Sequence, residues 1–277
     1  MNTYGKLVYF EFNRFIKLYL VLLVVTLVTQ IAGVVITSNQ YVSVAKKKMH
    51  EGVMSQATFV EEYEAMSMYQ ITENPWFMGP IACCITVMII YAFLIWYRDW
   101  FGKNTFIYRL LMLPTSRLTI LLAKASAIMI MVLGLVSFQL ILLTVENKIM
   151  KLTVPKGLRM DLDLIEFIHS HGYLSILIPP SFMEFFLYYA IGFMALLILF
   201  TAILFERSYR LKGAIIGVCY SILAVILFKA PDLIEGLLDK RYFYPIEILF
   251  IECVVMVLII IVSLLVSRKL LKDKITV

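Results

Sequence analysis

KLYLVLLVVTLVTQIAGVVIT, residues 17–37, decides the fold class, because it is an apolar run of the length that crosses a lipid bilayer. An α-helix rises roughly 1.5 Å per residue, so about 20 residues cover the ~30 Å hydrocarbon layer. Lys17 is the one charged side chain in the run, and it stands at its end. The stretch therefore predicts a transmembrane helix.

Five further runs of this kind follow along the chain. The composition agrees with them, because 62% of the 277 residues are hydrophobic and 16% are charged, and the mean hydropathy is +0.90. Soluble domains average about 45–50% apolar residues and about 25% charged residues. The sequence predicts an all-α, polytopic membrane protein with six transmembrane helices, at about 17–37, 76–97, 119–145, 181–205, 213–229 and 244–266.

Lys and Arg are distributed unevenly between the two sides of the predicted membrane. The side that holds both termini carries 15 basic residues and four acids, while the other side carries ten basic residues and twelve acids. Cytoplasmic loops of membrane proteins are enriched in Lys and Arg. We therefore expect a multi-pass chain in the cell membrane with both termini in the cytoplasm. The net charge of +6 then reflects topology and does not indicate nucleic-acid binding.

Catalytic and nucleotide-binding motifs are missing. The chain has no GxxxxGK[ST] phosphate loop and no HExxH pair, and its four cysteines fall inside spans without zinc-site spacing. Glu61 and Glu62 suggest an intramembrane glutamate peptidase, but they lie in an outer loop, and no histidine inside a span completes a metal site. We expect a chain with no enzymatic activity, metal or cofactor of its own.

Acidic side chains are costly inside a membrane, so those near the spans need an explanation. Glu184, three residues after Ser181, fits a helix capping box, and Glu247 fits the first turn of the last span. Glu252 lies about eight residues into that span, and we expect it to line a translocation path or to pack against protein. Small residues four apart in the fifth span allow close packing, inside this chain or at a dimer seam: Gly213, Gly217 and Ser221.

The segments outside the spans carry weaker signals. Residues 1–16 form a helix at the membrane interface or simply extend the first span. The outer intervals 38–75 and 146–180 are long, and we expect a helix with a mixed polar face in the centre of the first. PDLIEGLL, residues 231–238, is a short amphipathic piece that either dips back toward the membrane or lies on the surface.

FIYRLLMLPTSR, residues 106–117, is almost as apolar as a span but too short to cross a membrane. Gly102 ends the second span and Pro114 turns the chain into the third, which predicts a helix over about 105–114. Such a helix covers only about 14 Å. On the cytoplasmic side its apolar face needs a host, which is either the membrane surface or a groove on another protein.

The predicted chain has an interfacial helix, six spans and a cytoplasmic helix that ends in Leu-Pro-Thr-Ser-Arg (113–117), with Lys124 downstream. In these features it resembles permease subunits of ABC-2 type transporters over essentially its whole length. The resemblance implies one permease domain over 1–277 and a coupling helix at 105–114 that docks in a cleft of a separate ATPase. It also implies two permeases, as a homodimer or related heterodimer, with two ATPase subunits that bind ATP and Mg²⁺. The residues implied in ATPase coupling are Phe106, Tyr108, Arg109, Leu110, Leu113, Pro114 and Arg117.

Within that family, the chain's size and first outer interval are similar to Gram-positive exporters of amphipathic peptides, such as the phenol-soluble modulin exporter. The resemblance implies export of an amphipathic or lipophilic substrate, a peptide toxin or antimicrobial, across the cytoplasmic membrane. The alternatives are a membrane sensor or immunity protein that does not transport, a peptidase, and an exporter of a lipid or an ion.

Overall fold

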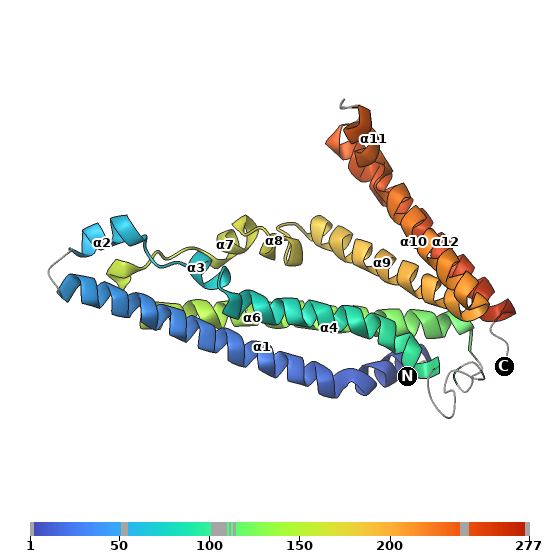
Figure 1. The fold of residues 1–277 in the computed structure, drawn as a ribbon, viewed down its shortest axis with the longest axis horizontal. Coiled ribbons are helices and arrows are strands. Elements are labelled where there is room, and N and C mark those ends of the chain that lie inside the picture. Colours follow the sequence, from blue (N-terminus) through green and yellow to red (C-terminus); the bar gives the residue numbers. More distant parts are fainter. Residues whose placement is uncertain are drawn as a thin grey trace. The chain divides into compact units, whose positions relative to one another are not determined.

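The computed structural model describes residues 3–50, 55–100, 110, 112, 115–238 and 244–274. These residues form α-helices, one short 3₁₀ helix (η1) and an isolated bridge between Met66 and Arg159. In chain order, as drawn in Figure 1, the elements are α1 (Thr3–His50), α2 (Gln56–Tyr63), α3 (Met68–Thr72), α4 (Pro75–Trp100), α6 (Arg117–Thr153), η1 (Lys156–Leu158), α7 (Leu164–Ser170), α8 (Leu174–Leu177), α9 (Phe182–Tyr209), α10 (Leu211–Phe228), α11 (Ala230–Leu238) and α12 (Pro245–Asp273).

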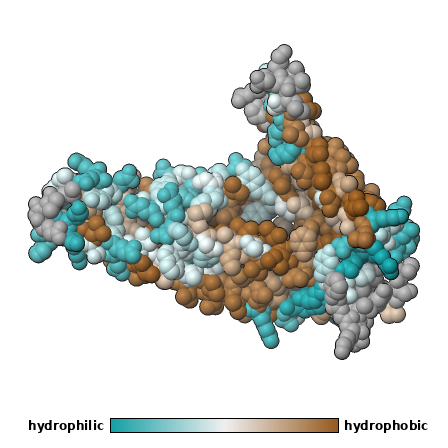
Figure 2. All heavy atoms as spheres, viewed as in Figure 1, coloured by the Kyte–Doolittle hydropathy of each residue, from teal (hydrophilic) through white to brown (hydrophobic). Residues whose placement is uncertain are grey.

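Six helices in the described part of the chain are long and apolar enough to cross a membrane: α1, α4, α6, α9, α10 and α12. Each corresponds to one predicted span, so the prediction of an all-α, multi-pass chain is confirmed. The outward faces of the long helices are largely hydrophobic, as Figure 2 shows for one side of the molecule. Such faces suit contact with lipid.

α1 is longer than its predicted span. It has 48 residues, which correspond to about 72 Å, more than twice the bilayer core. The helix expected over residues 1–16 is present from Thr3 onward, and it continues into the first span without a break. No proline interrupts the run, so the backbone ladder continues and extends the first span.

Local signals fix several helix starts. α4 begins at Pro75, whose fixed φ suits the first helical position. The Ser55 hydroxyl accepts a hydrogen bond from the Thr58 amide (3.2 Å) and caps α2. At α12, the Tyr244 amide donates to the Glu247 carboxylate (2.9 Å), which accounts for an acid at that position. Glu184 lies in the first turn of α9.

The chain divides into two compact units. The first contains Met1–Arg14, Ile89–Met129 and Phe182–Val277, and the second contains Phe15–Met88 and Ile130–Ser181. α1, α4 and α6 therefore contribute residues to both units.

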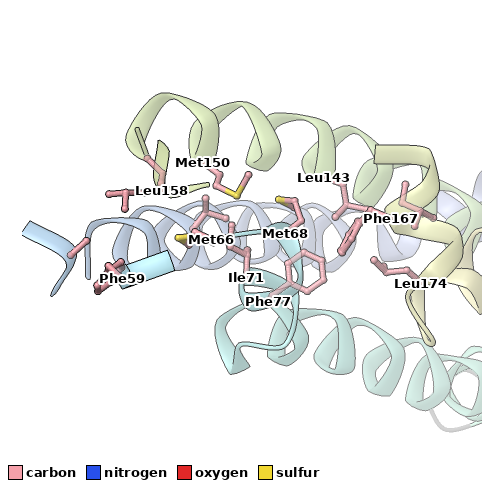
Figure 3. Close-up of a cluster of buried hydrophobic side chains, with 14 residues drawn as sticks. Phe59, Met66, Met68, Ile71, Phe77, Leu143, Met150, Leu158, Phe167 and Leu174 are labelled. Atoms are coloured by element: carbon pink, nitrogen blue, oxygen red, sulfur yellow. The ribbon is translucent and has the colours of Figure 1, made fainter. Parts of the chain in front are cut away.

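In the second unit the two outer intervals fold onto each other and share a core. The Met66 amide donates to the Leu158 carbonyl (3.0 Å), and the Met160 amide donates to the Met66 carbonyl (2.9 Å). The Tyr173 hydroxyl donates to the Thr72 carbonyl (2.8 Å). Figure 3 shows buried side chains from both intervals gathered in one cluster with Phe77 of α4 and Leu143 of α6. The labelled side chains from the intervals are Phe59, Met66, Met68, Ile71, Met150, Leu158, Phe167 and Leu174.

In the first unit α9, α10 and α12 pack together, with α10 and α12 side by side in Figure 1. Two hydroxyl pairs join these helices. Thr201 Oγ1 bonds Ser267 Oγ (2.9 Å), and the Tyr220 hydroxyl bonds Ser263 Oγ (2.6 Å). Such polar contacts, with small residues at the interfaces, hold membrane helices together where the hydrophobic effect between them is weak.

Candidate functional site

Five charged side chains gather in the first unit, beside the end of α4 and the start of α6. Two are carboxylates, Glu11 on α1 and Asp99 on α4. Three are cations, Arg14 on α1, Arg98 on α4 and Lys124 on α6. We call these five residues the ion-pair cluster.

Lys124 lies at the centre of the ion-pair cluster and is fully buried. Its ammonium donates to Glu11 Oε1 (2.6 Å), to Asp99 Oδ2 (2.5 Å) and to the Ile95 carbonyl (3.1 Å). An ammonium has three protons to donate, and each has an acceptor here. Lys124 thus ties α6 to α1 and α4 at once.

The two arginines complete the ion pairs from the outer side of the cluster. Arg14 Nη1 donates to Asp99 Oδ1 (2.7 Å), and Arg98 Nη2 donates to Glu11 Oε2 (3.2 Å). Glu11 and Asp99 are almost completely buried, while both arginines are partly exposed. Each carboxylate therefore faces the buried lysine on one oxygen and an arginine on the other.

The helix spacing of α4 explains how its residues reach the cluster. Tyr91, Ile95, Arg98 and Asp99 stand at intervals of four, three and one, which places them on one helical face. The Tyr91 hydroxyl donates to the Glu11 carbonyl (3.3 Å). The Lys124 ammonium also lies over the buried Trp96 ring, 5.4 Å from its centre.

Burial makes this arrangement sensitive to any change of charge. Removing two ions from water costs several kcal/mol each, on the order of the energy that good pairing returns. Removing one partner leaves the other buried and poorly paired, at a cost of about 3–5 kcal/mol. The ion-pair cluster therefore fixes the relative positions of α1, α4 and α6 within the first unit.

Two residues of the ion-pair cluster flank the predicted coupling segment, 105–114, in the sequence. Asp99 lies six residues before Thr105, and Lys124 lies ten residues after Pro114. Five of the proposed coupling residues lie outside the described residues: Phe106, Tyr108, Arg109, Leu113 and Pro114.

The remaining two coupling residues are held within this chain. Leu110 is buried, with 4% of its surface exposed, so its side chain faces the chain's own residues. The Arg117 guanidinium donates to the Leu271 carbonyl near the end of α12. Met112, in contrast, is 71% exposed.

The other sequence candidates have packing partners in the first unit. Glu252 accepts a hydrogen bond from Lys229 (2.7 Å), which also donates to Asp232 (2.9 Å). A Cβ on Gly213 would lie 1.9 Å from the Phe205 carbonyl oxygen, so α9 and α10 approach closely at this glycine. Gly217 lies against Ala202 of α9, and the Ser221 hydroxyl donates to the Gly217 carbonyl (2.9 Å).

Sequence reasoning missed the ion-pair cluster, although a signal was present. Glu11 and Asp99 are two of only four acids on the strongly basic side of the predicted membrane. An acid in such a segment is expected to have a basic partner, but the sequence does not say which one.

Glu146 of α6 was also missed. It is fully buried, and neither carboxylate oxygen has a hydrogen-bond partner among the described residues. Sequence reasoning placed it at the start of an outer loop, whereas α6 continues to Thr153. A buried carboxylate without donors is an unfavourable arrangement.

Among the described residues, no three His, Cys, Asp or Glu side chains gather so that they could hold a metal ion. Comparisons with protein-family models, curated protein sequences and solved structures give no match. The six apolar helices define a multi-pass helical membrane protein. What it does has to be argued from its own residues.

Proposed function

We propose that this chain is the permease subunit of an ABC exporter, driven by a separate ATPase that docks on residues 105–114. The observation that carries the proposal is the ion-pair cluster, because it joins the end of α4 and the start of α6, the two helices that flank this segment, to α1. The Leu-Pro-Thr-Ser-Arg sequence (113–117) supplies the family resemblance.

The mechanism follows from the rigidity of these connections. A partner that moves residues 105–114 displaces the end of α4 and the start of α6. Because Lys124 binds both Asp99 and Glu11, α1 must move with them or the buried ion pairs must break. Breaking buried pairs is costly, so movement of the three helices as one body is favoured.

The substrate is an amphipathic or lipophilic molecule, such as a peptide toxin or antimicrobial, that enters a path between two permeases from the lipid. Support for this part comes from the hydrophobic outward faces of the six helices and from the resemblance to Gram-positive peptide exporters. ATP and Mg²⁺ bind to the ATPase. The termini and residues 105–114 face the cytoplasm.

Co-purification with candidate ABC ATPases tests the proposal. Leu110→Asp is unsuitable, because Leu110 is buried in its own chain and a carboxylate there would disturb folding. Arg109→Glu and Met112→Asp are the informative variants, and Lys148→Glu, an exposed charge reversal on α6 in the second unit, is the matched control.

We expect the wild type and Lys148→Glu to retain the ATPase, and Arg109→Glu and Met112→Asp to lose it while keeping wild-type melting temperatures. Retention of the ATPase by both segment variants would refute docking at this segment. A wild type that binds no ATPase would refute the function.

A membrane sensor is the second candidate, and the second unit favours it. There the two outer intervals form a folded core, whereas short loops would suffice to connect spans. ATP-driven accumulation of a labelled amphipathic peptide in proteoliposomes containing chain and ATPase separates the two functions, because a sensor binds the peptide without accumulating it.

A further inference from the structure

A hollow of about 410 Å³ lies in the first unit where α9 turns into α10. Its described lining comes from the end of α4, the end of α9 and the start of α10. The lining residues are Trp100, Glu206, Arg207, Arg210, Leu211 and Ala214. The volume falls in the range of about 300–1,000 Å³ that small-molecule sites in proteins occupy.

Positive charge predominates in the hollow. Arg207 and Arg210 both line it, and exposed Lys212 stands next to it in sequence. The one acid in the lining, Glu206, accepts a hydrogen bond from the Tyr97 hydroxyl. Among the described lining residues, two arginines against one glutamate leave a net positive charge.

Aromatic rings position one of the two arginines. The Arg207 guanidinium lies 4.6 Å from the centre of the Tyr97 ring and 5.7 Å from that of the Trp100 ring. Cation–π contacts of this kind help to fix the position of a guanidinium. Tyr and Trp are also the residues that gather where membrane helices reach the headgroup layer.

The start of α10 adds a second feature that favours an anion. Arg210 is the N-cap residue of this 18-residue helix, and its side chain makes no capping hydrogen bond. The first amides of a helix have no intrahelical acceptor, and they carry a partial positive charge that favours phosphate. Leu211 and Ala214, in the first turn of α10, both line the hollow.

The hydrophobic surroundings identify what kind of anion fits. Leu211, at the rim, is 84% exposed, and Ile215, one turn further along α10, is 67% exposed. α10 is apolar enough to span a membrane, and in a membrane these side chains would lie beside acyl chains. A soluble phosphate would make no use of them.

We propose that this hollow binds the headgroup phosphate of an anionic phospholipid, with an acyl chain lying along Leu211 and Ile215. Arg210 and the α10 amides bind the phosphate, and Arg207 supports it from the aromatic side. Basic pockets between helices at a membrane surface are a recognised means of retaining anionic lipids. The assignment is independent of transport.

Native mass spectrometry of the full chain released from detergent tests the site. The probes are phosphatidylglycerol and phosphatidylcholine with identical acyl chains, and the variants are Arg210→Gln and Lys272→Gln. Lys272 is an exposed basic residue of the last turn of α12 that does not line the hollow. Thermal unfolding checks that each variant is folded.

We expect phosphatidylglycerol to bind the wild type and Lys272→Gln equally, and Arg210→Gln about fivefold more weakly, the effect of one basic residue near an anionic surface. Equal binding of phosphatidylcholine, or equal loss in Lys272→Gln, would overturn the assignment. Competition by glycerol 3-phosphate at the same concentration as the lipid would show a soluble phosphate site and would also overturn it.

Discussion

Lys124 is the central cation of the ion-pair cluster, and it reaches two carboxylates and a carbonyl on two other helices. A fully buried ammonium is tolerated only with such partners. In the proposed mechanism, Lys124 passes movement of residues 105–114 on to α1 through its buried ion pair with Glu11.

Replacing Lys124 by Met tests the strength of the ion-pair cluster. Glu11 and Asp99 would keep their arginines but lose the central ammonium, so we expect the unfolding free energy to fall by about 3 kcal/mol. Thermal unfolding in detergent measures the change as a clear drop in melting temperature. Lys272→Met, at an exposed position, is the matched control and should leave the melting temperature unchanged.

Neutralising the three central residues of the ion-pair cluster together tests whether unpaired buried charge is what destabilises Lys124→Met. The triple variant Glu11→Gln, Asp99→Asn, Lys124→Met leaves no buried charge unpaired, because the partly exposed Arg14 and Arg98 can turn to water. It should therefore be more stable than Lys124→Met alone. A single Lys124→Met variant as stable as the wild type would contradict the role assigned to the ion pairs.

The ion-pair cluster marks the limit of sequence reasoning at the residue scale. Charge counting located Glu11 and Asp99 on the basic side of the predicted membrane. It could not pair them with Lys124, because contacts between distant residues are needed, and Glu11 lies more than 100 positions from Lys124. Glu252 was expected to line a path or to pack, and Lys229, 23 positions away, is its partner. Neither pairing has a local signature.

At the scale of elements, hydrophobic length located all six membrane helices, because burying an apolar run in lipid depends on length and composition alone. It did not locate their ends. α1 and α6 continue through polar residues such as Lys46–Lys48 and Glu146, since a helix needs only a backbone ladder and good helix formers. The shared core of the two outer intervals depends on long-range packing, which a single sequence does not display.

The close approach of α9 and α10 gives a prediction at this scale. Gly213→Ala would place a Cβ 1.9 Å from the Phe205 carbonyl oxygen, so the helix pair must open. We expect a loss of about 1–3 kcal/mol, typical of an overpacked contact, measured as a lower melting temperature.

Gly192→Ala on α9 is the control, for which we expect no loss of stability or a gain. A Cβ there meets nothing within 4 Å, and Ala favours a helix over Gly by about 1 kcal/mol. Its melting temperature should stay or rise. If Gly213→Ala were as stable as Gly192→Ala, the α9–α10 contact would not be as tight as described.

At the scale of the whole molecule, the chain comprises two compact units that share α1, α4 and α6. The ion-pair cluster lies in the first unit, and the folded outer intervals lie in the second. Each shared helix is continuous over its described residues.

Site-specific photo-crosslinking in membranes tests the central claim most directly. A photoreactive residue replaces exposed Met112 in one variant and exposed Ser43 of α1 in another, and a candidate ABC ATPase is co-expressed with each. The account predicts an adduct with the ATPase from position 112 and none from position 43. An ATPase adduct from position 43, or none from position 112 while the two proteins co-purify, would contradict it.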